Sequence, residues 1–128
     1  PDAVEQADIV ATTTMARQPV VRGDWLRPGT HVDLIGAYKA DMREADDALL
    51  ARARLFVDSR ETTAHIGELL IPLGSGAITE DSIRGDLYDL VQPGVQGRAS
   101  DDDITVFKNG GGAHLDLMIA SWIIDRLG

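Results

Sequence analysis

The sequence predicts an α/β fold with a largely parallel sheet. Four short segments are rich in β-branched and apolar residues, and their hydrophobicity is continuous rather than alternating, which suits strands buried on both faces. Segments with helical spacing of apolar residues separate these strands, and strands that alternate with helices are typical of a parallel sheet. The predicted strands cover residues 8–13, 31–36, 55–58 and 104–107.

Helices are predicted over residues 45–54 and 62–70, because each segment carries three apolar residues at helical spacing. The acidic run at residues 44–47 is predicted to be a solvated face whose charges stabilise the start of the first helix. The apolar positions are Leu49, Leu50 and Ala53 in the first helix and Ile66, Leu69 and Leu70 in the second.

The next segments are predicted from residues that interrupt or begin helices. Residues 71–78 contain one proline and two glycines and are predicted to form a loop. Thr79 is predicted to be the N-cap of a new helix, because two acidic residues follow it in the first turn. A further short helix is expected over residues 86–91, and the polar, acidic residues 97–103 are expected to form a surface loop.

The last predicted element is the clearest amphipathic helix of the chain. It follows three consecutive glycines at residues 110–112. Apolar residues recur on one of its faces at intervals of three and four, as an amphipathic helix requires. The positions on this face are Leu115, Met118, Ile119, Trp122 and Ile123.

Composition excludes several classes of protein. The chain has 128 residues, with 12 basic and 21 acidic side chains and a net charge of −9. Its length suits one globular domain, and scattered basic residues argue against binding of nucleic acid. Without cysteine there is no disulfide, thiolate nucleophile or cysteine-bound zinc. No apolar run could span a bilayer and no signal-type leader is evident, so we expect a soluble, cytoplasmic protein with no membrane partner.

The end of the first predicted strand is a candidate binding site. Thr12, Thr13 and Thr14 follow each other there. Ligands of open parallel sheets bind beyond the carboxyl ends of the strands, where hydroxyl groups can hydrogen-bond a ribose or a phosphate. The alternative is structural, because threonine also favours strands and turns for their own sake.

Two other strand ends carry small residues. Ile35 is followed by Gly36 and Ala37, whose lack of side-chain bulk would let a flat ring or a ribose approach the backbone, although a tight turn explains them equally well. Asn109 and Gly110 lead from the last strand into a helix, whose first backbone N–H groups suit an anion. The segment at 107–112 lacks the glycine pattern of a phosphate loop and that of a dinucleotide-binding turn.

The histidines give no metal-binding pattern. His31, His65 and His114 are far apart in the sequence and lack the close spacing of metal-binding pairs. We therefore expect no bound metal.

Several strings occur in an order that is specific to one known family. They are ADIV at 7–10, LRPGTH at 26–31, GA at 36–37 with MRE at 42–44, VDSR at 57–60 and SDDDITVFK at 100–108. This succession resembles the ornithine cyclodeaminase/mu-crystallin family across nearly the whole chain.

The resemblance covers only the C-terminal part of the subunit of that family. It implies that residues 1–108 are the C-terminal half of an NAD(P)-binding Rossmann domain. Residues 109–128 would be the C-terminal helix that returns to the dimerisation domain. The family's N-terminal region, which carries the basic residues for the substrate carboxylate, has no counterpart here, and neither does the glycine-rich phosphate turn. The resemblance also implies NAD or NADP as cofactor and a homodimer, and the start at Pro1 instead of methionine agrees with a piece of a longer chain.

The resemblance assigns roles to the same strand ends. The threonines at 12–14 correspond to residues that line the dinucleotide, and residues 35–37 correspond to the backbone along its nicotinamide side. Asn109 stands where many members have a serine near the nicotinamide and the substrate, and an amide retains the ability to hydrogen-bond. Gly110 corresponds to a substrate-facing position.

Position 38 separates the activities of the family. Cyclodeaminases carry an aspartate there, which handles proton transfer as ammonia leaves the substrate. A tyrosine, with a usual pKa of about 10, cannot replace that base near neutral pH, but Tyr38 could donate a proton or a hydrogen bond. Reduction of a preformed cyclic imine needs only a hydride and a proton, and the string DMRE at 41–44 resembles the ketimine reductases.

We therefore expect NAD(P)H-dependent reduction of a cyclic ketimine such as Δ1-pyrroline-2-carboxylate to the cyclic amino acid, with Tyr38 at the catalytic position. An ornithine cyclodeaminase or an alanine-type amino-acid dehydrogenase of the same family is the alternative. A non-catalytic protein that binds small ligands, of the mu-crystallin type, is an alternative from another class. For Tyr38 itself the alternative is structural, because its ring could only fill the mouth of the pocket. The choice between NAD and NADP and the exact imine or amino-acid substrate stay open.

Overall fold

The computed structural model describes residues 1–127, except for the side chain of His114. Its five strands form one parallel sheet in the order β1-β2-β5-β3-β4. The predicted α/β class is confirmed, and each of the four predicted strands lies within two residues of its expected position. The strands are β1 (Ile9–Thr12), β2 (His31–Leu34), β3 (Arg54–Val57), β4 (Ile83–Gly85) and β5 (Thr105–Lys108).

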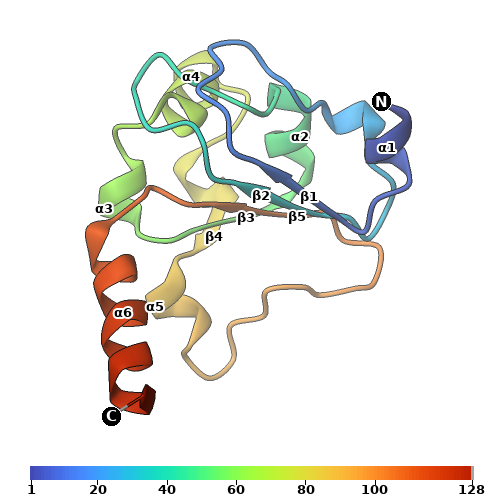
Figure 1. Ribbon diagram of the computed structural model, residues 1–128. Helices are drawn as coiled ribbons and strands as arrows, with labels where there is room; N and C mark the ends of the chain where they lie inside the picture. The colour runs from blue at the N-terminus through green and yellow to red at the C-terminus, as the bar shows by residue number, and fades with distance from the viewer. Residues whose placement is uncertain (128) are drawn as a thin grey trace.

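Helices lie on both sides of this sheet (Figure 1). The helices α2 and α4 cover one face, the loop before β5 runs past the other face, and α6 extends away from the body of the molecule. The described helices are α1 (Asp2–Glu5), α2 (Asp47–Arg52), α3 (Arg60–Thr63), α4 (Gly67–Ser75), α5 (Leu87–Leu90) and α6 (Ala113–Leu127), with 3-10 turns η1 (Gly23–Trp25) and η2 (Glu80–Ser82).

The main core lies between the sheet and the helices α2 and α4. Alternate side chains of the central strands pack against apolar residues of the two helices, so that each strand contributes every second residue to this face. Leu49 and Leu50 of α2 are fully buried there, as their spacing predicted. The central members of this core are Val32, Leu34, Leu49, Leu50, Leu55, Val57, Leu69 and Val106.

The acidic run at 44–47 stabilises the start of α2, as predicted, but it is not wholly exposed to solvent. Asp46 is the N-cap of α2, and its carboxylate accepts a hydrogen bond from the backbone N–H of Leu49 (2.9 Å). Asp47 lies in the first turn, where a negative charge is stabilised by the helix dipole. Glu44 is fully buried, so the prediction of a solvated face is wrong for this residue.

The structure differs from the prediction of one helix at 62–70 and a loop at 71–78. The helix is broken into α3 and α4, and α4 continues past the expected end to Ser75 with Pro72 inside it. Proline removes one helical hydrogen bond, but the ring of Pro72 is buried against the core, and this burial offsets the loss. The helix ends where Gly76 adopts a left-handed conformation (φ 77°), which glycine favours.

The helix predicted to begin at Thr79 is wrong. Thr79 does cap a turn, but that turn is the single 3-10 turn η2, and the chain then enters β4. Ile83 and Gly85 are buried and Arg84 is exposed, so this short segment alternates as a strand does when it pairs with β3. The short helix expected after it is confirmed as α5, with Asp86 as its N-cap.

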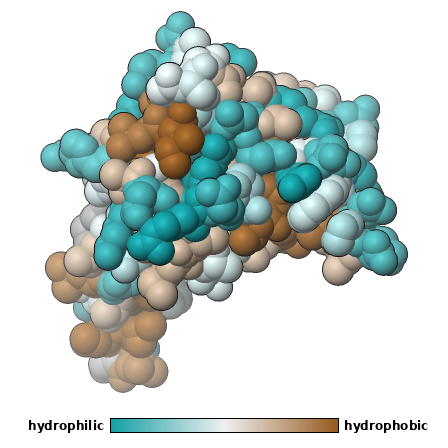
Figure 2. Space-filling model, turned by 90° about the horizontal axis from the view of Figure 1, so that it is seen from above, coloured by the Kyte–Doolittle hydropathy of each residue, from teal (hydrophilic) through white to brown (hydrophobic). Residues whose placement is uncertain are grey.

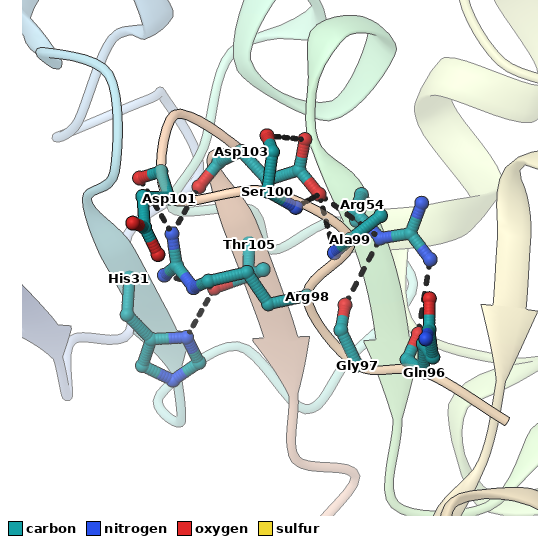
Figure 3. A network of polar contacts seen from close by, with 10 residues as sticks. All are labelled: His31, Arg54, Gln96, Gly97, Arg98, Ala99, Ser100, Asp101, Asp103 and Thr105. Carbon is teal, nitrogen blue, oxygen red and sulfur yellow. Dashed lines mark hydrogen bonds and ion pairs between the residues drawn. The ribbon is translucent and has the colours of Figure 1, made fainter.

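The loop between α5 and β5 is attached to the sheet by two arginines (Figure 3). Arg54 of β3 donates hydrogen bonds to the backbone carbonyls of Gln96 (2.9 Å) and Gly97 (3.0 Å). Arg98 donates to the hydroxyl of Thr105 on β5 (3.2 Å). The predicted surface loop is thus confirmed and is held in one place by polar contacts.

The last predicted helix is confirmed as α6. Near its start, Leu115 and Met118 line a cavity of about 260 Å³ together with Asp58 and with Tyr88 of α5. Farther along this face, Trp122 is 56% exposed and Ile123 is 44% exposed. Figure 2 shows hydrophobic residues gathered along this projecting helix. No helix among residues 1–127 is both long and apolar enough to cross a membrane.

Candidate functional site

The three candidate segments lie side by side at one edge of the sheet. Because the strands are parallel, their carboxyl ends meet at the same edge. Thr12 at the end of β1 is paired with Leu34 at the end of β2, and Leu34 is paired with Lys108 at the end of β5. The backbone N–H of Ile35 donates to the carbonyl of Thr12 (2.9 Å), and that of Asn109 donates to the carbonyl of Leu34 (3.0 Å).

The residues of this edge differ in their exposure. Thr13 and Thr14 are exposed, Thr12 is half-buried and Ile35 is 41% exposed, whereas Ala37 is fully buried. The hydroxyl oxygen of Thr12 is buried and has no hydrogen-bond partner among the residues that the structure describes. It lies close to the carboxylate of Glu44 and helps to lower the pKa of that group.

Gly36 allows the ends of β1 and β2 to approach each other closely. A Cβ atom at this position would lie 2.1 Å from both the backbone nitrogen and the backbone oxygen of Thr14. No side chain fits at that distance, so the two strand ends can take these positions only with glycine here.

The carboxylate of Glu44 joins the same two strand ends. Its Oε1 accepts hydrogen bonds from the backbone N–H (2.6 Å) and the hydroxyl (2.8 Å) of Thr14. Its Oε2 accepts from the backbone N–H of Gly36 (2.8 Å) and of Ala37 (3.3 Å). Burial alone would raise the pKa of Glu44, but these hydrogen bonds outweigh it and hold the pKa below its usual value. Glu44 is therefore ionised at neutral pH.

Two more buried charges lie behind Glu44. The carboxylate of Glu68 on α4 accepts from the backbone N–H groups of Glu44 (2.7 Å) and Ala45 (2.9 Å), and burial raises its pKa. The ammonium of Lys108 is fully buried and donates to the carbonyl of Leu34 (3.1 Å). Burial lowers the pKa of Lys108, and the charge of Glu68 opposes that shift. The lysine thus supplies positive charge between carboxylates.

Asp58, which follows β3, holds the loop after β5 in place. Asp58, which is 1% exposed, accepts from the backbone N–H of Gly110 (2.8 Å) and from the hydroxyl of Thr62 (2.9 Å). A Cβ atom on Gly110 would lie 2.7 Å from the Thr62 hydroxyl, so the loop after β5 packs tightly on the start of α3. Asp58 therefore fixes Gly110 in the way that Glu44 fixes Gly36.

Tyr38 lies at the outer end of the segment that follows β2. Its side chain is 52% exposed. The phenol oxygen lies 3.9 Å from Sδ of Met15, and the ammonium of Lys39 lies 5.4 Å from the ring centroid. Half of this side chain is therefore exposed to solvent.

The histidines lie elsewhere and differ in environment. Nδ1 of His31 is 2.8 Å from the hydroxyl of Thr105 (Figure 3), and burial lowers the pKa of His31. His65 is exposed, and the side chain of His114 lies outside the described residues. Within the described part of the chain, no group of three or more histidine, aspartate or glutamate side chains could hold a metal ion.

Four buried charged residues that shape the site were not predicted from the sequence: Glu44, Glu68, Lys108 and Asp58. Glu44 and Lys108 belong to the strings MRE and TVFK, and Asp58 belongs to VDSR, but those strings entered only as marks of resemblance. Burial of these charges depends on partners distant in the sequence, which local patterns do not reveal.

The geometry of this edge fits a nucleotide. Hydroxyl groups, backbone N–H groups and a closely packed glycine turn lie at the carboxyl end of a parallel sheet, where nucleotides bind in open α/β folds. The family model for the ornithine cyclodeaminase/mu-crystallin family matches residues 1–128. The chain belongs to this family.

Comparison with individual proteins agrees with the family. The chain is 76% identical over 124 residues to a Δ1-pyrroline-2-carboxylate reductase of Paracoccus denitrificans, a match that covers 96% of this chain and 39% of that relative. The chain therefore spans less than half the length of this curated relative.

Two solved structures show the same fold. The structure of Thermococcus litoralis Δ1-pyrroline-2-carboxylate reductase in complex with NADH and L-proline is similar to this chain, with a TM-score of 0.82 and 38% identity over 86% of this chain and 34% of that one. An archaeal alanine dehydrogenase dimer with bound NAD gives a TM-score of 0.83 and 32% identity, covering 92% of this chain and 38% of that one.

Proposed function

We propose that the protein containing this chain reduces a cyclic ketimine such as Δ1-pyrroline-2-carboxylate to the cyclic amino acid with NADH or NADPH. The observation that carries this proposal is the 76% identity to a Δ1-pyrroline-2-carboxylate reductase. Tyr38 supports it, because a phenol stands where cyclodeaminases of the family carry a carboxylate base.

The residues at the sheet edge would each have a distinct task in this reaction. Bound NADH or NADPH would supply the hydride. Thr12, Thr13 and Thr14 would line the dinucleotide, and the segment of Ile35, Gly36 and Ala37 would lie along its nicotinamide side. In the loop after β5, the amide of Asn109 would lie near the nicotinamide, and Gly110 would face the substrate.

The full-length protein is expected to oxidise NADH or NADPH when Δ1-pyrroline-2-carboxylate is added, because imine reduction needs only hydride transfer and one proton. The measurement is the loss of dinucleotide absorbance at 340 nm, about 10³-fold or more above the rate without enzyme. Release of ammonia from ornithine, without oxidation of dinucleotide by the imine, would contradict the proposal and favour a cyclodeaminase. Reductive amination of pyruvate in place of imine reduction would favour an alanine-type dehydrogenase.

Substitution of Tyr38 with phenylalanine is expected to lower kcat for imine reduction by about 10²-fold and to leave the Kd of the dinucleotide unchanged, because only the proton-donating hydroxyl is removed. Tyr88→Phe is the matched control, because it removes the same hydroxyl from a side chain that is 69% exposed on α5. A kcat within threefold of wild type for Tyr38→Phe would show that the proton comes from another donor, such as water.

We also propose that residues 1–108 complete a Rossmann domain and that residues 109–128 belong to a dimerisation domain. The free edge of β1 supports the first part, because Ile9 there is 68% exposed and, among the described strands, β1 pairs with β2 alone. The exposed apolar face of α6 supports the second, because such a face needs a covering surface. The protein would then be a homodimer, which its mass in solution would test. A cytoplasmic location stays a prediction.

A further inference from the structure

We propose that Glu44 is a positioning residue for the dinucleotide, because its buried carboxylate sets the spacing between the two strand ends that would line that ligand. This inference rests on the proposed function, and in particular on a dinucleotide bound at the edge of β1 and β2. Glu44 itself is fully buried, so it would act through Thr14 and Gly36 and would not touch the reacting atoms.

The two oxygens of Glu44 are divided between the two strand ends. Oε1 accepts from Thr14, at 2.6 Å from its nitrogen and 2.8 Å from its hydroxyl, and Oε2 accepts from Gly36 at 2.8 Å and Ala37 at 3.3 Å. Hydrogen bonds to an ionised acceptor are about twice as strong as neutral ones. The carboxylate therefore acts as a bridge that needs both of its oxygens and its charge.

The backbone of Glu44 is itself fixed in place. Its carbonyl accepts from the N–H groups of Val20 (2.8 Å) and Val21 (3.0 Å), and its own N–H donates to Glu68 on α4 (2.7 Å). The bridge between the strand ends is thus anchored to the helical layer. A displacement of Glu44 would therefore move Thr14 and Gly36, which are hydrogen-bonded to its carboxylate.

The close contact at Gly36 makes this spacing critical. The backbone of Gly36 approaches that of Thr14 so closely that no Cβ fits between them. At this close approach, the backbone N–H groups of Thr14 and Gly36 both donate to the carboxylate of Glu44, which holds the two segments together. Loss of one oxygen would release one strand end and open the distance that a ribose or nicotinamide ring would have to match.

The test is the substitution Glu44→Gln in the full-length protein. Glutamine has the same shape but a single acceptor oxygen, and its NH₂ group would face the N–H donors of one strand end. We expect the Kd of NADH, measured by its fluorescence, to rise 10- to 100-fold. We expect kcat at saturating dinucleotide and the KM of the imine to stay within threefold of wild type. Glu80→Gln is the control, because it removes the same charge from an exposed side chain on η2.

The outcomes separate this inference from the proposed function. An unchanged Kd for NADH in a folded Glu44→Gln protein would overturn the inference, and so would a fall in kcat without a change in Kd. If wild type binds NADH but does not reduce the imine, the proposed function fails while the Kd comparison still tests Glu44. If wild type binds no dinucleotide, both fail.

A second variant keeps the test decisive if Glu44→Gln does not fold. Glu44→Asp keeps the charge and both oxygens, but its side chain is shorter by one methylene and cannot reach both strand ends. The same rise in Kd is expected, and wild-type affinity in Glu44→Asp would overturn the inference.

Discussion

Substitution of Gly36 with alanine is expected to weaken dinucleotide binding by at least about 100-fold and to lower the free energy of unfolding by about 3 kcal/mol. The new Cβ would lie 2.1 Å from the backbone nitrogen and oxygen of Thr14, and backbone atoms cannot move aside as a flexible side chain can. The ends of β1 and β2 would have to separate, which would break the hydrogen bonds from Gly36 and Ala37 to Glu44. Urea unfolding and NADH fluorescence measure the two effects.

Gly74→Ala is the matched control for this substitution. Gly74 lies in α4, and a Cβ there would meet no atom within 4 Å. Because alanine favours a helix more than glycine does, we expect the free energy of unfolding to rise by about 0.5–1 kcal/mol and the Kd of NADH to stay unchanged. A folded Gly36→Ala protein with wild-type affinity for NADH would show that the close approach of the strand ends is not needed.

The sheet and the place of the candidate site could be predicted from the sequence because both depend on local patterns. Continuous apolar runs mark buried parallel strands, and residues that follow such runs must lie at one edge of the sheet. The threonines after β1 and the small residues after β2 were found in this way. Their mutual contacts, such as that between Ile35 and Thr12, follow from parallel pairing alone.

The charged residues behind the site could not be predicted because their burial depends on distant partners. Glu44 occurs in an acidic run next to a helix start, where local reasoning favours exposure. Its carboxylate is instead matched by backbone donors 30 and 8 residues away. Lys108 ends an apolar strand, yet its ammonium reaches a carbonyl 74 residues away in the sequence.

The errors in the helices have a similar origin. Pro72 and Gly74 are correct local signals for a break, but burial of α4 against the sheet overrides them. The three residues of β4 are too short to show a period, and their pairing with β3 decides their conformation. Tertiary contacts thus decide the structure where the local pattern is short or weak.

Substitution of Lys108 with methionine is expected to lower the free energy of unfolding by about 3–5 kcal/mol at neutral pH. Methionine fills a similar volume, so the main change is the loss of a buried positive charge that interacts electrostatically with Glu68, Glu44 and Asp58. The carbonyl of Leu34 would keep its hydrogen bond from Asn109, so the loss is mainly electrostatic. Urea unfolding measures it, with Lys39→Met as the control, since Lys39 is exposed and we expect a change below about 1 kcal/mol.

The pH dependence of this variant tests the electrostatic explanation. Burial already raises the pKa of Glu68, and the charge of Lys108 opposes that shift, so removal of the lysine should raise the pKa further. As the pH falls through this raised value, folded protein binds a proton that unfolded protein does not yet bind, and the free energy of unfolding therefore increases. The gain continues down to the unfolded pKa of about 4.3. The stability difference between wild type and Lys108→Met should thus become smaller between neutral pH and about pH 5, whereas a constant difference would mean that lost packing, not charge, destabilises the variant.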